Sequence, residues 1–497
     1  MGLNSFLGLK IKLIKVVMPN FIHAFFFILF SLVSILNHYY FRSAGLDYGL
    51  ANQALYQFAH FKSAIISETL NAESLSYLSC HLSFWVPILS PFYWLFGSYT
   101  LLIFQNLALI FAGIGLTKLT TYFNLRKGIS NLVLIQFYCF FAIYAALAFD
   151  YHDNVIGACF LPWLFYFYLT EKTGLTLLCF FAVLISKENM AILLGFTSIT
   201  MWLLNKGFTW KNCQLPIMLL LGSLSWFLIA SLIIMPAISP NGNFEQLSRY
   251  SYMGSSLKEI VNFIFTHPLK MIELFYKSHI QPDNQEIVKQ EFLWVLFLSG
   301  GFALIRKPAF LWMALPILMQ KLWNKELAFW GLDFHYQIEL AAIVSMAIIF
   351  WIKDIKSLNL RVCLIVLTTT STAFITWYKM DSRYSDYHHP EKENIFMKAH
   401  YQAPIGLQNI RKGIQLIPKD SPICAQTNLM PHLSNRDKLY HFPMIRDARY
   451  LVFLHPQLNS YPLSNELAMH FIDSIRLQKN WKEDSTYSPL RIITKLN

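Results

Sequence analysis

Long apolar runs alternate with short polar gaps along most of the chain. A transmembrane helix needs about 20 predominantly apolar residues, and tilted or tightly paired helices can be shorter. Runs of this kind lie near residues 16–39, 98–122, 129–149, 155–170, 174–186, 188–204, 214–237, 291–305, 308–323, 337–352 and 360–378. The pattern therefore predicts an all-α polytopic membrane bundle over residues 1–378, with about eleven transmembrane helices.

Basic residues in the gaps predict which way the bundle faces. Lys and Arg in short loops are retained on the cytoplasmic side of a membrane. With the N-terminus inside, that side receives Lys118, Arg126, Lys127, Lys172, Lys206, Lys211, Arg306, Lys307, Lys353, Lys356 and Arg361. An odd number of spans then places the C-terminus outside, so the expected topology is N-in and C-out.

Two longer loops fall on the outer side in this topology. The first, residues 41–97, contains His81–Phe96, an apolar segment broken by two prolines that we expect to be interfacial or re-entrant. Apolar positions at helical spacing predict an interfacial helix over Tyr48–Ile66. The second loop, residues 236–290, contains the turn sequence SPNG and a predicted amphipathic helix over Leu257–Phe265.

The composition becomes ordinary and polar from residue 379 onward. Short strand-like runs occur there, namely IPKDSPICAQT, KLYHF, RYLVFL and LRIITKL, together with a helical pattern over Ser464–Lys479. Residues 379–497 are therefore predicted to form a small extracytoplasmic α/β domain.

Composition and charge exclude other classes of protein. Hydrophobic residues make up 55% of the 497 residues and charged residues only 14%, which is more apolar surface than one soluble core buries. A net charge of +12 could indicate nucleic-acid binding, but Lys and Arg are scattered among short gaps instead of gathering on one soluble face. We therefore expect a lipid bilayer, and no nucleic acid, as a partner.

A short set of ionisable residues gathers on the predicted outer side. An ionisable side chain at membrane depth is costly, so it calls for a partner, a water-filled cavity or a function. A carboxylate near the membrane surface can act as a general base on a hydroxyl or bind a divalent metal, and Lys and His can bind the phosphate of a lipid-linked donor. The members of the set are Asp47, His81, Asp150, His152, Lys187, Glu188 and His335.

Each of these residues also has a purely structural interpretation. Charges at helix ends are commonly solvated, or snorkel toward the interface. Lys187 and Glu188 stand in a tight turn and could form a local ion pair. Asp150 and His152 could end and cap a helix, and His335 could simply pack beside a tyrosine. The residue pattern leaves both interpretations open.

Six segments carry a family resemblance: GLDYGLANQALYQFAH, HLSFWVPILSPFYWLFGSYTLLIFQNLAL, FDYHDNVIGACFLPWLFY, SKENMAILLGF, GLDFHYQIELAAI and AQTNLMPHLSNRDKLYHFP. Together they resemble the DUF2079 family of predicted bacterial membrane proteins, a relative of the GT-C glycosyltransferases. The resemblance implies a GT-C-like fold in the bacterial inner membrane, an active site facing the periplasm and a polyprenyl-phosphate sugar as donor. It also implies an acceptor or metal role for Asp47 and a donor-phosphate role for Lys187. The chain departs from the better-understood GT-C enzymes because its first outer loop lacks an Asp-Glu pair.

The residues and the resemblance together predict a membrane glycosyltransferase that transfers a sugar from a polyprenyl-phosphate donor to a glycan, lipid or protein acceptor. Asp47 and Asp150 are the expected catalytic residues, and Asp47 is the candidate ligand of a divalent metal, Mg or Mn. The residues expected to bind the substrate or its phosphate are His81, His152, Lys187, Glu188 and His335, of which Lys187, with His81 and His335, is expected to hold the donor phosphate.

Two alternatives belong to other classes of protein. A transporter or flippase of a lipid-linked or polar substrate would carry its charges near the middle of the bilayer. A non-catalytic scaffold would have Lys187 and the outer carboxylates more than about 10 Å apart, with no shared pocket.

Overall fold

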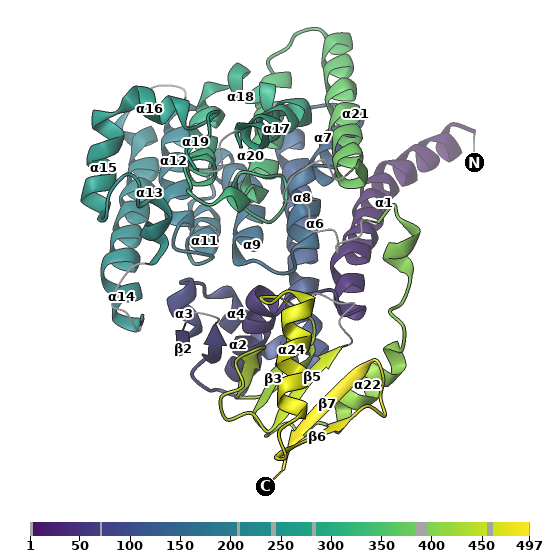
Figure 1. Ribbon diagram of the computed structural model, residues 1–497. Coiled ribbons are helices and arrows are strands. Elements are labelled where there is room, and N and C mark those ends of the chain that lie inside the picture. The colour runs from purple at the N-terminus through teal and green to yellow at the C-terminus, as the bar shows by residue number, and fades with distance from the viewer. Residues whose placement is uncertain are drawn as a thin grey trace.

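The computed structural model describes residues 3–69, 72–205, 209–239, 245–280, 285–382, 395–454 and 461–496. Within these residues, the apolar runs predicted from the sequence lie on helices. The helices of the bundle are α1 (Leu3–Tyr39), α6 (Thr100–Tyr122), α7 (Lys127–Tyr138), α8 (Phe141–Ala148), α9 (Asp153–Cys159), α10 (Leu161–Leu169), α11 (Thr173–Leu184), α12 (Met190–Leu203), α13 (Trp210–Ile229), α14 (Met235–Ile238), α17 (Glu286–Leu296), α18 (Phe302–Arg306), α19 (Pro308–Leu322), α20 (Ile338–Ile352) and α21 (Leu358–Ser382). Figure 1 shows this bundle with the C-terminal domain at one end of it.

Length and composition identify the helices that could cross a membrane. Among the described residues, 6 segments qualify: Asn20–Tyr39, Trp85–Tyr122, Lys127–Ala148, Asn212–Ile238, Glu286–Arg306 and Leu358–Lys379. Shorter apolar helices accompany them, namely Thr173–Leu184, Met190–Leu203, Pro308–Leu322 and Ile338–Ile352. The run predicted at residues 155–170 is divided between α9 and α10. The helical membrane architecture is confirmed, while the number of spans and their direction stay predictions.

Helix α20 lies at the centre of the bundle. It is apolar around its circumference and buried along nearly its whole length, as is typical of a core helix. The neighbouring segment Glu286–Arg306 is broken at Gly300, whose φ is 103°. A Cβ at Gly300 would be strained by this backbone conformation and would lie 2.9 Å from Ile348 of α20. The glycine therefore allows the broken helix to approach α20 closely.

The first loop, residues 41–97, is compact and differs from its predicted form. Its elements are η1 (Gly45–Gly49), α2 (Leu50–Ala59), β1 (Ile65–Thr69), β2 (Ala72–Ser76), α3 (Tyr77–Cys80), α4 (Trp85–Leu89), η2 (Ser90–Phe92), α5 (Tyr93–Phe96) and η3 (Gly97–Tyr99). The helix predicted over Tyr48–Ile66 is too long, because α2 ends at Ala59 and the chain enters the β1–β2 hairpin. The polar side chains of Asn52 and Gln53 on α2 are fully buried. The segment with two prolines is broken into short helical turns that run on into α6 within the candidate span Trp85–Tyr122, so its interfacial or re-entrant placement stays a prediction.

The second loop, residues 236–290, contains η5 (Glu245–Tyr250), α15 (Leu257–Thr266) and α16 (Pro268–Glu273). The predicted helix over Leu257–Phe265 is confirmed. Its N-terminus is fixed by Ser256, whose hydroxyl accepts a hydrogen bond from the backbone N–H of Glu259. The predicted SPNG turn lies mostly outside the described residues.

The C-terminal region forms a five-stranded sheet in the order β4-β3-β5-β7-β6. Its elements are α22 (Leu407–Leu416), β3 (Ile423–Ala425), α23 (Met430–Leu433), β4 (Leu439–His441), β5 (Tyr450–Leu454), α24 (Asn465–Arg476), β6 (Trp481–Asp484) and β7 (Leu490–Lys495). Strand β3 runs parallel to β4 and β5, whereas β7 is antiparallel to β5 and β6. The four predicted strand runs and the predicted helix are confirmed.

The C-terminal domain packs against the first loop (Figure 1). The N–H of Gly45 donates to Thr427 Oγ1 at 2.9 Å. A Cβ at Gly49 would lie 3.1 Å from Met430 Cβ, so the backbones of η1 and α23 are in close contact. Lys62 forms an ion pair with Asp437 at 2.7 Å. The domain therefore covers the first loop, which explains why α2 is buried.

Candidate functional site

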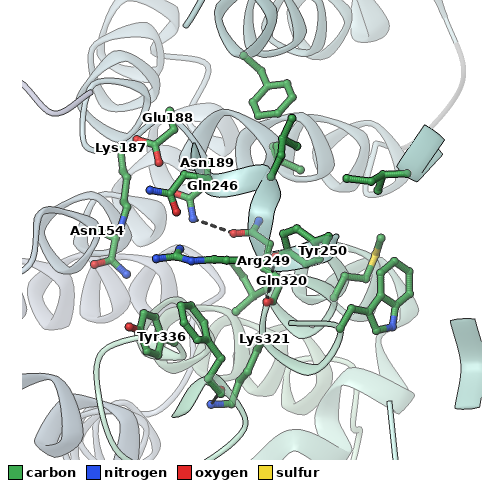
Figure 2. Close-up of a pocket in the computed structure, with 18 of the residues that line it drawn as sticks. Asn154, Lys187, Glu188, Asn189, Gln246, Arg249, Tyr250, Gln320, Lys321 and Tyr336 are labelled. Atoms are coloured by element: carbon green, nitrogen blue, oxygen red, sulfur yellow. Dashed lines mark hydrogen bonds between the residues drawn. The ribbon is translucent and has the colours of Figure 1, made fainter. Parts of the chain in front are cut away.

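A cavity of about 230 Å³ lies where the α11–α12 turn, the second loop and the start of α20 meet. The polar residues that line it include Asn154, Lys187, Glu188, Arg249, His335 and Glu339. The apolar lining residues include Phe227, Leu257, Ile260, Ile264, Ile317 and Trp323. In Figure 2, Asn154, Lys187, Arg249 and Tyr336 lie together at one end of the cavity. The cavity is therefore amphipathic, with a polar end and an apolar end.

Two cations converge on the polar end. Lys187 comes from the α11–α12 turn and Arg249 from η5 of the second loop, and Figure 2 shows their charged groups directed toward Asn154 from different sides. Burial lowers the pKa of Lys187, Glu188 raises it, and Arg249 lowers it by charge repulsion. Figure 2 marks no hydrogen bond on the Lys187 amine. Two cations that repel each other in a partly desolvated cavity favour an anion between them.

Glu188 pairs with a residue of the first loop and not with its neighbour Lys187. Its Oε1 lies 3.1 Å from His81 Nδ1, and its Oε2 accepts a hydrogen bond from the N–H of Leu82 at 3.2 Å. Burial alone would raise the pKa of Glu188, but His81 and Lys187 lower it to about 2. Glu188 is thus a buried carboxylate that ties the first loop to the α11–α12 turn, and it leaves the Lys187 ammonium facing the cavity.

His152 and His335 form a stacked pair beside the cavity. Their ring centroids are 3.4 Å apart with an interplanar angle of 18°, and the nearly parallel ring of Phe149 lies 5.2 Å from His152 and 5.9 Å from His335. Burial lowers the pKa of both rings, so both are uncharged at neutral pH. His335 lines the cavity, whereas the other ring of the pair faces the first loop.

Asp47 is not among the residues that line the cavity, and it lies beside His152 of this pair. Its carboxylate is 45% exposed, and Oδ1 lies 3.9 Å from His152 Nε2. No group of three or more His, Cys, Asp or Glu side chains suited to a metal ion occurs in the part of the chain that the structure describes. Mg²⁺ and Mn²⁺ prefer several oxygen ligands, which the surroundings of Asp47 do not provide. The residues around Asp47 therefore do not fit the Mg or Mn ion that was expected there.

Asp150 lies apart from the cavity lining. It is 2% exposed, and its Oδ2 accepts a hydrogen bond from the N–H of Ala44 at 2.8 Å. Its φ of 68° is in the left-handed region, which Asp tolerates better than most residues. The backbone carbonyl of Asp150 accepts from Gln105 Nε2. The geometry favours a positioning role, in which Asp150 fixes the start of the first loop just before Asp47.

Several lining residues are not among the site residues predicted from the sequence, and one of them, Glu339, was interpreted there as a charge at a helix end. Glu339 Oε1 accepts a hydrogen bond from Asn154 Nδ2 at 2.8 Å, and the two lie 185 positions apart in the chain. Arg249 carried no sequence signal, because it stands in a loop of ordinary polarity. Lys321 lines the cavity, but its ammonium donates to the carbonyls of Phe329 and Gly331 at 2.6 Å each. Lys321 therefore supports the segment that carries His335 and is not available to a ligand.

The comparisons with known proteins agree with the membrane architecture. A family model described as a predicted membrane protein, DUF2079, matches residues 37–487. None of the curated proteins compared with the chain matches it. The matched range contains the first loop, the cavity and most of the C-terminal domain. The chain therefore belongs to the DUF2079 family of predicted membrane proteins.

Proposed function

We propose that this protein is a membrane glycosyltransferase that takes a sugar from a polyprenyl-phosphate donor at the extracytoplasmic face of the bacterial inner membrane. The observation that carries the proposal is the amphipathic cavity, in which Lys187 and Arg249 stand at one end and apolar side chains at the other. A phosphate attached to a long apolar chain has the same division of polarity. The outward-facing site and the GT-C-like arrangement are part of this proposal.

The polar end supports binding of a phosphate. Lys187 offers a point charge with three donors, and the planar guanidinium of Arg249 can hold two phosphate oxygens at once. Glu188 is engaged by His81, and it only partly offsets the charge of Lys187, whose pKa it raises by less than burial lowers it. The Nε of Arg249 lies 4.0 Å from Glu326 Oε1, and its guanidinium lies over the ring of Phe329 at 4.7 Å. An anion would relieve the repulsion between the two cations.

The apolar end supports binding of a hydrocarbon chain. Leu257, Ile260 and Ile264 of α15 line the cavity on one side of that helix. On the same helix Phe265 is 80% exposed, so α15 also presents an apolar surface away from the cavity. Lys258, Glu259 and Asn262 are exposed on the same helix, so α15 is amphipathic, as expected of a helix at the membrane interface beside a bound lipid tail.

We assign the acceptor side of the reaction to Asp47 and His152. The acceptor oxygen forms a bond to the anomeric carbon of the sugar, and the bond from that carbon to the phosphate oxygen breaks. The acceptor proton passes to Asp47, and polyprenyl phosphate leaves as the anion held by Lys187 and Arg249. The uncharged ring of His152 orients the Asp47 carboxylate from 3.9 Å. A carboxylate that is partly exposed can receive an acceptor arriving from the aqueous side.

Turnover by the purified protein tests the proposal. In lipid nanodiscs, the wild type should release polyprenyl phosphate from a polyprenyl-phosphate hexose when an acceptor glycan is supplied. The Asp47→Asn variant should lose this activity and still fold, whereas Asp420→Asn, at an exposed carboxylate of the C-terminal domain, should keep it. Full activity of Asp47→Asn would remove Asp47 from the mechanism. Absence of any transfer by the wild type with the donors and acceptors tested would count against the enzyme.

A further inference from the structure

Buried polar atoms without a hydrogen-bond partner among the described residues occur at several positions of the cavity lining, including Asn189, Gln320 and Trp323, and one group of them lies together on a single wall. Asn154 Oδ1, Glu339 Oε2 and both ring nitrogens of His335 are buried and have no hydrogen-bond partner among the described residues. The three side chains are 5%, 2% and 4% exposed, and all three line the cavity. Buried polar atoms in native proteins nearly always have partners, so a cluster of unpaired ones beside an empty space indicates a ligand with matching groups.

The unpaired atoms specify the chemistry of that ligand. The amide nitrogen of Asn154 donates to Glu339 Oε1 at 2.8 Å, which leaves the amide oxygen as the free atom. Asn154 Oδ1 and Glu339 Oε2 are both acceptors, so they require O–H or N–H donors. An uncharged imidazole at His335 can donate from one nitrogen and accept at the other. Several hydroxyl groups on one small ring satisfy this set.

A phosphate group does not satisfy these atoms. Ionised phosphate has only acceptor oxygens to offer, and the carboxylate of Glu339 would repel it. The cations Lys187 and Arg249 stand beside this wall at the same end of the cavity. The polar end is thus divided into a cationic part suited to phosphate and an acceptor-rich part suited to hydroxyls.

We propose that Asn154, Glu339 and His335 form a subsite for the hydroxyl groups of the donor's sugar, next to the phosphate held by Lys187 and Arg249. The assignment to a donor sugar rests on the proposed function. The chemistry of hydroxyl recognition stands on the unpaired atoms themselves. The donor is therefore expected to carry an uncharged, hydroxylated hexose and not a lipid phosphate alone.

Equilibrium binding in nanodiscs tests the subsite without requiring turnover. Two ligands are compared, a polyprenyl phosphate and the same lipid with one hexose on its phosphate. The wild type should bind the hexose-bearing lipid on the order of 10-fold to 100-fold more tightly, as expected for two or three added hydrogen bonds. In the variant Asn154→Leu/Glu339→Leu this ratio should fall to about one, while the plain lipid phosphate should bind at least as tightly as it does to the wild type, because a carboxylate that repels it is gone.

Replacing both members of the bonded pair by apolar residues avoids leaving one of them unsatisfied, and thermal unfolding confirms that the variant is folded. The matched control Asn409→Leu/Glu466→Leu changes exposed residues of the C-terminal domain and should keep the wild-type ratio. Lys187→Gln should weaken binding of both lipids and leave their ratio unchanged.

An equal affinity of the wild type for both lipids, or a wild-type ratio in the double variant, would overturn the subsite. A phosphate-free hexose oligosaccharide forms the third arm. The double variant could lose binding of this oligosaccharide and still prefer the hexose-bearing lipid over the plain lipid phosphate. In that case the subsite binds hydroxyl groups of the acceptor, and its assignment to the donor is wrong. A subsite that behaves as expected in a protein without transferase activity would contradict the proposed function alone.

Discussion

Acidification should loosen the contact between the C-terminal domain and the first loop through His441. This residue ends β4 and is completely buried. Its Nδ1–H donates to the carbonyl of Phe442 at 2.8 Å, and its Nε2 has no hydrogen-bond partner among the described residues. A Cβ at Gly45 would lie 3.2 Å from its Cδ2, so the ring packs directly against the first loop. A proton on Nε2 would place a cation in this contact with nothing to accept it.

The loss of stability on acidification can be calculated from the pKa of His441. Burial is the largest cause that lowers the pKa of His441, from 6.5 to about 4. The unfolded chain therefore binds a proton more readily than the folded one, and the stability contributed by the neutral ring is complete above about pH 6.5 and is lost as the pH falls toward 4. Between about pH 8 and pH 5 the loss amounts to about 2 kcal/mol, which corresponds to about 30-fold in the opening equilibrium.

Hydrogen exchange measures this effect. Protection factors of amides in β3 and β4 are determined in nanodiscs at both pH values for the wild type and for His441→Asn, whose amide nitrogen replaces Nδ1 but does not titrate. The wild type should lose about 30-fold more protection than the variant on acidification. His470→Asn, at an exposed histidine of α24, should behave like the wild type. An equal loss in the wild type and His441→Asn would refute the reasoning.

Three further substitutions test other contacts. Gly157→Ala should lower the free energy of unfolding by about 1–3 kcal/mol, because the new Cβ would lie 2.7 Å from Ser186 Cβ; an unchanged thermal midpoint would contradict this packing. Lys321→Met should lower the free energy of unfolding by about 3 kcal/mol, because three buried acceptors lose their donor. Unchanged hydrogen exchange of the backbone amides next to these acceptors would show that Lys321 does not support this segment. Arg42→Gln removes three hydrogen bonds to the carbonyls of residues 399–402 and should speed protease cleavage there by about 10-fold; equal cleavage rates would show that the guanidinium does not hold this segment.

The sequence predicts the helices well, because a spanning helix needs a continuous apolar run that is visible without any tertiary information. The C-terminal strands β3 and β5 are recognisable for a similar reason, since each is a short run of mostly buried apolar residues, and β7 contributes the buried residues Leu490, Ile492 and Ile493. The strand β6 was missed because it alternates between partly buried and exposed positions and has the sequence WKED, which carries a single apolar residue. The helix α22 was missed because only Ile410 and Gly413 on it are buried.

The contacts within the candidate site were harder to predict from the sequence than the helices. Of the ionisable residues grouped by the sequence, Lys187, Glu188 and His335 line one cavity, whereas Asp47, His81, Asp150 and His152 are not among its lining residues. The partner of Glu188 could not be foreseen, because His81 lies 107 residues away and the adjacent Lys187 was the simpler choice. Arg249 was missed for a related reason, since only the fold carries η5 from the second loop to the α11–α12 turn.

The most direct test of the central claim is the affinity of the protein for a polyprenyl-phosphate hexose. In nanodiscs we predict saturable binding by the wild type, and a dissociation constant raised about 10-fold to 100-fold by Lys187→Gln or Arg249→Gln, as expected for the loss of one charge-assisted hydrogen bond. Lys258→Gln, an exposed lysine of the same second loop, should bind like the wild type. Wild-type affinity in both cavity variants would contradict the account.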